Sequence, residues 1–394
     1  GGQHKSKRLG WKRQKERATG VLLPPGFSPS RLSLPLSLSL SSAPRVSVRP
    51  LLSRRRPRSY RHLACSKLSP LVSQPMDRWT GCFKVSLNPT KAGSCLKVAA
   101  SLMFSPSSRT LLMPSVNAIL FNGDKVQGTG NSVIERLSDS RNISELLVSK
   151  LGCSANVWVV EASTFNGPFA VYKEFIPSLT SRGDPKRYDP NGFPASSAIV
   201  AILSRCFEQQ VPSLTSSNLV EQTKGNVDAP TLLPTPFPKT IILGFSKGGT
   251  VVNQLVTEFA HLKASPQIFD RRQDHLYPIS EDDLLFSISE FHYVDVGLNS
   301  AGAYLTDRTV IKKVAELLLV HNASVRFVLH GTPRQWFDRH RPWIRKEKDI
   351  MLQLLKDEAH RCEGKLQATE RFYFANNLPS LQMHFEIIQV MDLS

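Results

Sequence analysis

The sequence predicts an α/β fold in which helices cover both faces of a mostly parallel central sheet. Two observations predict it. Short apolar segments rich in β-branched residues, typical of buried parallel strands, alternate along the chain with segments of helical apolar spacing. In addition, one strand–helix junction contains Gly244-Phe-Ser-Lys-Gly248, which fits the pattern G-x-S-x-G. The chain of 394 residues is 41% hydrophobic, which is enough to build a large core.

The basic charge of the chain is concentrated at its beginning. Residues 1–75 hold 16 of the 50 Lys and Arg residues but one of the 32 acidic residues, so the rest carries 34 basic and 31 acidic side chains. A nucleic-acid-binding surface is therefore not expected on the folded part. We expect 1–75 to be a disordered Ser-, Arg-, Leu- and Pro-rich tail, and 76–394 to form a single domain. The tail is interpreted as a transit peptide, an artefact of gene prediction upstream of Met76, or a basic arm.

The first half of the domain contains alternating strand and helix patterns. Strands are predicted at 82–86, 96–100, 117–121 and 156–160, and helices at 131–150 and 196–209. The first two strands are expected to form an antiparallel edge. The polar segment 161–192 is interpreted as a lid or a substrate-side loop. Residues 211–239 contain several prolines and are expected to be a flexible insertion within the domain.

The second half continues the alternation. Strands are predicted at 240–243, 286–295, 325–330 and 371–374, helices from Thr250 and at 309–319 and 342–359, an irregular loop at 264–285, and a short helix or strand at 385–391. The strand before Ser246 and the helix after it are the surroundings that a nucleophile elbow requires. The alternative is an ordinary turn in which Ser246 caps the helix. The elbow predicts a fold like that of the α/β-hydrolases.

A serine nucleophile needs a base and an acid that orients the base. In α/β-hydrolases these follow the serine in the order acid, then histidine. His384, which we expect on a loop after the last strand, is the candidate base, and His330 at the end of a strand is the alternative. Asp295, at the end of the strand that follows the elbow helix, is the candidate acid, and Asp338 is the alternative.

Two backbone segments are candidates for an oxyanion hole. The amide of Lys247 lies at the start of the elbow helix. Residues Asn122, Gly123 and Asp124 follow an early buried strand, where α/β-hydrolases place the second donor. An ordinary Asn-Gly turn explains the same residues equally well.

The sequence gives no indication of a cofactor or a metal site. None of the six cysteines forms C-x-x-C or stands at metal-ligand spacing to histidines, and dinucleotide and P-loop motifs are absent. No uninterrupted apolar run is long enough for a transmembrane helix. The mixture of bases and aromatics at 336–343 is too small to predict a nucleic-acid surface.

Several short motifs resemble those of a eukaryotic family of mitochondrial proteins that is named for an open reading frame on human chromosome 2. The motifs are Phe245-Ser-Lys-Gly248, Asn253-Gln-Leu255, Tyr293-Val-Asp295, Thr332-Pro333, Trp343-Ile344, Lys346-Glu347 and His384-Phe385. The resemblance covers residues 115–390 and implies an α/β-hydrolase-like fold with a serine hydrolase triad at Ser246, Asp295 and His384, no established substrate, and a link to mitochondrial respiratory function. Val296 and Leu298 stand where the vertebrate form has a glycine and a histidine, so a role for that histidine is not carried over.

The sequence therefore predicts a serine hydrolase that acts on an ester, thioester or amide, with an acyl substrate that is a small molecule or lipid-like. The alternative is an inactive hydrolase fold that binds a protein partner. The resemblance and the transit-like tail imply a mitochondrial location, with the cytoplasm and the plastid as alternatives.

Overall fold

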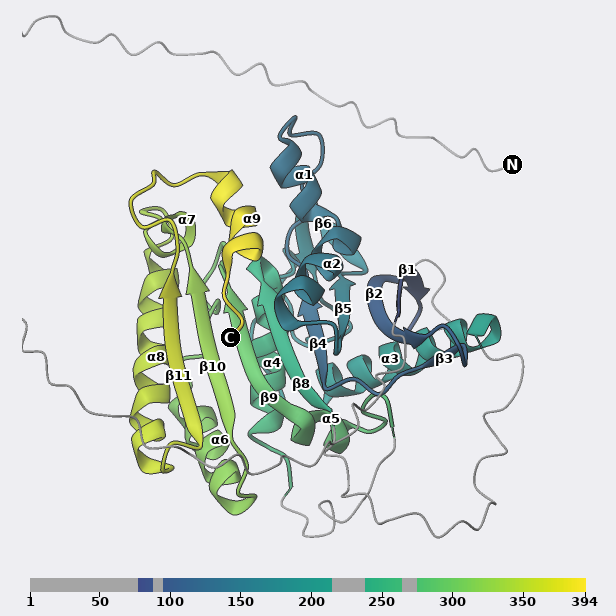
Figure 1. Ribbon diagram of the computed structural model, residues 1–394. Helices are drawn as coiled ribbons and strands as arrows, with labels where there is room; N and C mark the ends of the chain where they lie inside the picture. The colour runs from purple at the N-terminus through teal and green to yellow at the C-terminus, as the bar shows by residue number, and fades with distance from the viewer. Residues whose placement is uncertain (1–76, 88–94, 215–237, 264–274) are drawn as a thin grey trace, which may run out of the picture. The chain divides into compact units, whose positions relative to one another are not determined.

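The computed structural model describes residues 77–87, 95–214, 238–263 and 275–394 (Figure 1). The strands are β1 (Asp77–Val85), β2 (Leu96–Ser105), β3 (Thr110–Leu111), β4 (Val116–Phe121), β5 (Ala155–Glu161), β6 (Thr164–Asn166), β7 (Phe169–Val171), β8 (Lys239–Phe245), β9 (Ile288–Val294), β10 (Val325–Gly331) and β11 (Leu366–Phe372). The helices are α1 (Ser132–Ser138), α2 (Ser140–Leu151), α3 (Pro194–Leu214), the 3-10 turn η1 (Ser246–Gly248), α4 (Gly249–Phe259), α5 (Glu281–Ser287), α6 (Arg308–Val320), α7 (Pro333–Trp336), α8 (Pro342–Arg361) and α9 (Leu381–Val390).

The main sheet has the strand order β1-β2-β5-β4-β8-β9-β10-β11, and β3 pairs with β2. β2 is antiparallel to β1 and β5, whereas β5, β4, β8, β9, β10 and β11 run parallel to one another. The chain thus starts at one edge, passes from β2 to β4, places β5 between these two, and then adds β8, β9, β10 and β11 in turn on the other side of β4. This strand order, with β2 antiparallel to its neighbours near one edge of an otherwise parallel sheet, is that of an α/β-hydrolase, so the predicted fold class is confirmed.

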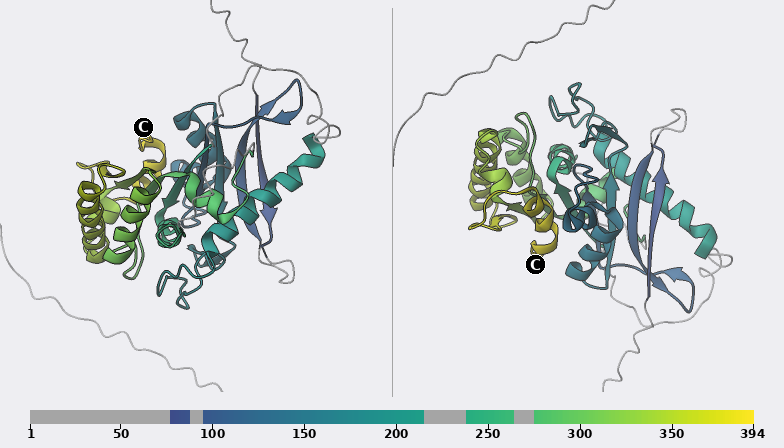
Figure 2. Two further views of the ribbon diagram at one scale, coloured as in Figure 1. Left: turned by 90° about the horizontal axis from the view of Figure 1, so that it is seen from below. Right: turned by 90° about the horizontal axis from the view of Figure 1, so that it is seen from above.

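Helices cover both faces of this sheet, as Figures 1 and 2 show. Alternate residues of a strand point to opposite faces. In β4, Ala118 and Leu120 join an apolar cluster with α1, α2 and α9, whereas Ile119 and Phe121 join a second cluster with α3, α4, α6 and α8. Because both faces are covered, the central strands are buried along nearly their whole length, which explains their continuous apolar sequences.

The parallel register brings the ends of several strands to one edge of the sheet. Phe121 at the end of β4 pairs with Gly244 in β8, and Phe245 pairs with Val294 in β9. His330 near the end of β10 pairs with the same Val294. The residues that follow β4, β8, β9 and β10 therefore meet at this edge, which is where ligands bind in open α/β sheets.

Some predicted elements differ from the structure. The helix predicted at 131–150 is two helices, because the Asp139 side chain accepts hydrogen bonds from the amides of Arg141 and Asn142 and so caps α2. The predicted loop 264–285 contains the start of α5, which Ser280 caps. The last strand begins at Leu366 rather than 371. The sequence did not predict its first residues because they are mostly polar and exposed.

Several predictions fall wholly or partly on residues outside the described ones. The tail at 1–75 lies outside them, as do 215–237 of the predicted insertion. The insertion was also placed too early, because α3 continues through residue 214.

Candidate active site

Ser246 lies on a tight turn between β8 and α4. Its φ angle is +52°, in the left-handed region that non-glycine residues rarely adopt. The glycines on both sides leave room for the turn. A Cβ atom at Gly248 would lie 2.1 Å from the Phe121 carbonyl oxygen, and one at Gly244 would lie 2.6 Å from Gly249 Cα. The backbone at Ser246 is thus held in a left-handed turn by close packing that only glycine permits at both flanking positions.

The loop after β4 packs directly against Ser246. A Cβ atom at Gly123 would lie 2.5 Å from Ser246 Cβ. The hydroxyl of Tyr172 donates a hydrogen bond to the Asn122 carbonyl and so holds the loop from behind. The Asn122 amide donates to the Val160 carbonyl at 2.9 Å. The Gly123 amide donates to Asn122 Oδ1 at 2.8 Å. Among the described residues the Asp124 amide has no such acceptor.

His384 and Asp295 are hydrogen-bonded to each other. Nδ1 of His384 lies 2.7 Å from Oδ2 of Asp295, and both side chains are buried. The predicted loop position of His384 is wrong, because the residue lies in the first turn of α9, which begins after the cap residue Ser380. The helix fixes the ring, which also stacks on Phe245 with centroids 4.7 Å apart. The sequence signal for this helix start was Ser380 followed by an apolar run.

Asp295 is held rigidly at the end of β9. Its φ angle is +44°, and its amide donates to the His330 carbonyl at 2.8 Å. Its carboxylate accepts hydrogen bonds from Thr332, at 2.7 Å from the amide and 2.9 Å from the hydroxyl. Thr332 was quoted as part of a family motif but was not predicted to have a functional role, and the motif does not reveal that Thr332 holds the carboxylate. The carboxylate is therefore oriented toward His384 by a neighbouring strand end.

The two alternative residues have other partners. Asp338 Oδ2 accepts a hydrogen bond from Arg341 at 2.9 Å. Its partial burial raises its pKa, but hydrogen bonds from the His340 amide and from Arg341 outweigh this and leave the pKa below its ordinary value. His330 is hydrogen-bonded to His292 at 2.9 Å and to the Tyr373 hydroxyl at 3.0 Å. The structure thus brings Asp295, rather than Asp338, to His384, and it places His330 in a separate buried network.

This buried histidine pair predicts loss of stability in acid. Burial, followed by the neighbouring His292, holds the pKa of His330 well below its ordinary value, and burial also lowers the pKa of His292. The unfolded chain therefore takes up protons at these sites below about pH 6.5, where the folded protein does not. We expect the free energy of unfolding to be highest above that pH and to fall by up to about 1.4 kcal/mol per histidine for each pH unit below it. Urea unfolding at pH 7.5 and 5.5 measures this loss, and His330→Gln should reduce it. An unchanged slope in His330→Gln would contradict the assignment.

Ser246 opens onto a cavity of about 30 Å³. The cavity is also lined by Asp124, Phe169, Asp184, Lys247, Gly297, Leu298, Asn299, Gln335 and Arg341. Ser246 itself is only 2% exposed. Within the described residues no hydrogen bond joins its hydroxyl to His384. Such bonds are often long in unliganded enzymes and shorten when a substrate binds.

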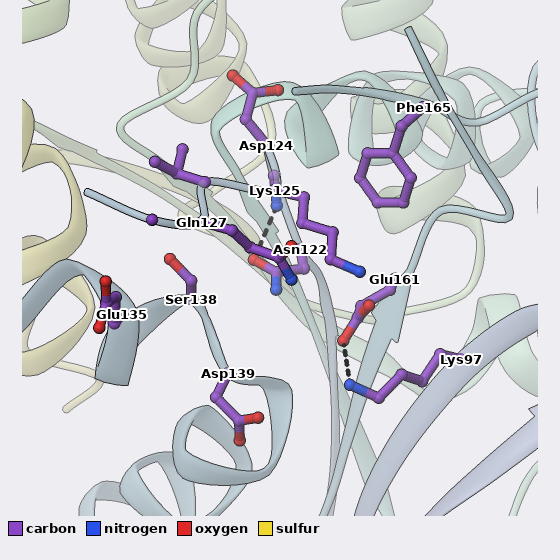
Figure 3. A pocket seen from close by; sticks show the side chains of 13 residues that line it. Lys97, Asn122, Asp124, Lys125, Gln127, Glu135, Ser138, Asp139, Glu161 and Phe165 are labelled. Atoms are coloured by element: carbon purple, nitrogen blue, oxygen red, sulfur yellow. Dashed lines mark hydrogen bonds and ion pairs between the residues drawn. The ribbon is translucent and has the colours of Figure 1, made fainter. Parts of the chain in front are cut away.

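Asp124 also lines a second cavity. The second cavity, of about 260 Å³, lies beside residues 122–128 (Figure 3). Lys97 and Glu161 form an ion pair of 2.9 Å in its wall, and Asp124 points away from Asp139 on the opposite side. Burial raises the pKa of Asp124, although the nearby His384, the Ala170 amide and two cations act against this. Asp124 therefore belongs to the electrostatic surroundings of His384.

Lys247, directly after the serine, contacts a loop in the segment 161–192. Its ammonium group lies 2.9 Å from Asp184 Oδ1, and both side chains are less than 10% exposed, at 7% and 9%. The same group donates to the Arg182 carbonyl at 3.3 Å. Both residues belong to the segment 161–192, which therefore forms one wall of the cavity. Asp184 could not be predicted from sequence, because neither its spacing nor its neighbours distinguish it from a surface acid.

In the part of the chain that the structure describes, no group of three or more His, Cys, Asp or Glu side chains is arranged to hold a metal ion. Within the same ranges, the structure contains no helix that is long and apolar enough to cross a membrane.

Known proteins similar in sequence come from one family. A family model described as C2orf69 matches residues 203–360. The mitochondrial protein C2orf69 homolog of Danio rerio is 26% identical over 245 residues, which is 60% of this chain and 60% of that protein. The resemblance to the C2orf69 family is confirmed. The Mus musculus homolog is 29% identical over 177 residues, or 43% of this chain and 41% of that protein. The chain therefore spans less than two thirds of the length of these relatives, whose names support its predicted mitochondrial location.

Solved structures of similar fold include esterases and related hydrolases. An S-formylglutathione hydrolase from Agrobacterium tumefaciens is 12% identical, with a TM-score of 0.33, and the match covers 81% of this chain and 95% of that one. A feruloyl esterase module from Clostridium thermocellum is 10% identical, with a TM-score of 0.37, over 80% of this chain and 87% of that one. The fold of this chain is defined by its own strand order rather than by these distant likenesses.

Proposed function

We propose that this chain is a serine hydrolase that cleaves an ester, thioester or amide by way of an acyl-enzyme on Ser246. The observation that carries the proposal is the hydrogen bond of 2.7 Å between His384 and Asp295. It lies at the sheet edge where Ser246 stands on a left-handed turn. A buried carboxylate holds the Nδ1–H tautomer of the imidazole, which leaves Nε2 free to accept a proton. The residues that follow β8 and β9 thus supply the serine and the acid, and α9 supplies the base.

In the proposed reaction His384 removes the hydroxyl proton as Ser246 attacks the carbonyl carbon. The negative charge that develops on the carbonyl oxygen needs backbone donors. The Lys247 amide lies at the start of a helix, where the first N–H groups have no intrahelical acceptor. We propose the Asp124 amide as the second donor, because the amides of Asn122 and Gly123 are bonded elsewhere. His384 then returns the proton to the leaving group, and water releases the acyl group by the same steps.

A fluorophosphonate probe tests the proposal, because it reacts covalently with an activated serine. We expect the chain to be labelled, and Ser246→Ala to lose all labelling. Ser204→Ala, on α3 and away from the site, serves as the matched control and should be labelled as the wild type is. Labelling that persists in Ser246→Ala, or a wild type that is never labelled, would exclude the proposed nucleophile.

A binding module with an inherited hydrolase fold is the second candidate. The near-complete burial of Ser246, at 2% exposed, favours it, because little of the hydroxyl is open to an attacking substrate. It predicts no labelling and a stable complex with a protein partner. Under either proposal the site of action is the mitochondrion, as the names of the relatives imply.

A further inference from the structure

The cavity at Ser246 restricts the acyl group that the site can take. We propose that this acyl group is short and carries, near its carbonyl carbon, a neutral oxygen that accepts a hydrogen bond from Arg341. The inference rests on the proposed hydrolase function and names its substrate class. It is argued from the size of the cavity, from the ion pair that fixes its wall, and from the Nη donors of Arg341, which have no partner among the described residues.

The cavity has a volume of about 30 Å³. A single buried water needs about 10–15 Å³, so the space beside Ser246 suits a group of a few heavy atoms. A long alkyl chain would have to displace the wall. That wall includes the buried pair of Lys247 and Asp184, and separating two such charges in a dry site is costly. The cavity is therefore expected to stay small when the substrate binds.

Arg341 supplies hydrogen-bond donors to this cavity. Its Nε atom donates to Asp338 Oδ2 at 2.9 Å, and its side chain is 18% exposed. This single bond orients the planar guanidinium group. In the part of the chain that the structure describes, the Nη atoms of Arg341 have no hydrogen-bond partner. A charged donor without a protein acceptor can form a charge-assisted hydrogen bond to an oxygen of the ligand.

The charges around the cavity decide which kind of oxygen fits. Asp184 is neutralised by Lys247, but Asp124 also lines the cavity and is held there by the Ala170 amide at 3.4 Å. A carboxylate on the substrate would meet Asp124 as a like charge. An ether, keto or hydroxyl oxygen accepts from Arg341 without that repulsion. The geometry therefore favours a neutral oxygen over both an alkyl carbon and an anionic group.

Two esters of 4-nitrophenol with equal numbers of heavy atoms test the inference. The methoxyacetate has an oxygen where the butyrate has a methylene group. Each kcat/KM is divided by the rate constant for hydroxide hydrolysis of the same ester, which removes the difference in intrinsic reactivity. We expect the corrected preference for methoxyacetate to be about 10-fold or more, as for a hydrogen bond to a charged group. Butyrate should in turn be preferred to octanoate.

Variants assign the preference to Arg341. Arg341→Met should bring the corrected ratio to about one, and Arg341→Lys, which lacks the planar fork, should give an intermediate ratio. Arg339→Met, an exposed neighbour, should keep the wild-type ratio. A ratio near one in the wild type, or a wild-type ratio in Arg341→Met, would overturn the inference. Fluorophosphonate labelling of each protein tests the proposed function separately from the substrate class. An unlabelled wild type contradicts the proposed function itself, whereas a labelled wild type that prefers butyrate contradicts only the substrate class. If Arg341→Met does not fold, the ratio in Arg341→Lys decides.

Discussion

Asp295→Asn is expected to lower ester hydrolysis by about 10⁴-fold while leaving the protein folded. The asparagine side chain has nearly the same shape and can still accept a hydrogen bond from Thr332, which donates to Asp295 through its amide and its hydroxyl. An amide group next to His384 Nδ1 can, however, donate a hydrogen bond. It would then stabilise the tautomer that carries its proton on Nε2, and this tautomer cannot accept the proton of Ser246. The large loss follows from this change of tautomer.

The matched control is Asp338→Asn, which alters the other acid that sequence order allows. Asp338 is bonded to Arg341 and the His340 amide rather than to His384. Because Asp338 does not contact His384, Asp338→Asn should lower the rate far less than Asp295→Asn does, and its effect should come through its bond to Arg341. The rates are measured on the same ester at saturating and limiting concentrations, and a thermal melt checks the fold. A large loss in Asp338→Asn with little loss in Asp295→Asn would reverse the assignment of the acid.

The fold was predictable from sequence because its main determinants are local. Buried parallel strands such as β5 and β8 are continuous apolar runs, and the turn at Ser246 requires small residues at fixed positions on either side. The order of Ser246, Asp295 and His384 along the chain could also be read directly. The distances between these side chains in the folded protein could not be predicted. The hydrogen bond that joins Asp295 to His384 spans 89 positions of sequence and selects one of two acids that spacing alone left open.

The predictions that were wrong or incomplete also have physical causes. β11 lies at the sheet edge and has mostly exposed side chains, so its sequence lacks the apolar pattern of the inner strands. Asp139 interrupts an otherwise continuous helical pattern by capping α2. The roles of Thr332, Asp184 and Arg341 arise only when distant segments meet. Thr332 belongs to one of the family motifs, but its motif does not reveal its contact with Asp295, and the local sequences of Asp184 and Arg341 are not distinctive.

Breaking the buried pair of Lys247 and Asp184 should have the largest effect on stability. Asp184→Ala would leave the Lys247 ammonium group, which is 7% exposed, with the Arg182 carbonyl as its remaining hydrogen-bond acceptor. A buried charge that loses its partner typically costs about 3–5 kcal/mol. We expect a loss of that size in the free energy of unfolding, measured by urea denaturation at neutral pH. Asp184→Asn keeps an acceptor oxygen and should cost less.

Two further variants show that the loss comes from the unpaired buried charge. The double variant Asp184→Ala with Lys247→Met removes both charges and should recover part of the stability, because apolar replacements of a buried pair are often close to neutral. Glu316→Ala breaks the exposed pair with Lys312, whose side chains are 60% and 57% exposed, and should cost at most about 0.5 kcal/mol. If Asp184→Ala costs no more than Glu316→Ala, the pair is not a fixed wall of the cavity. The segment that carries Asp184 could then move away from Ser246, and longer acyl groups would fit beside the serine.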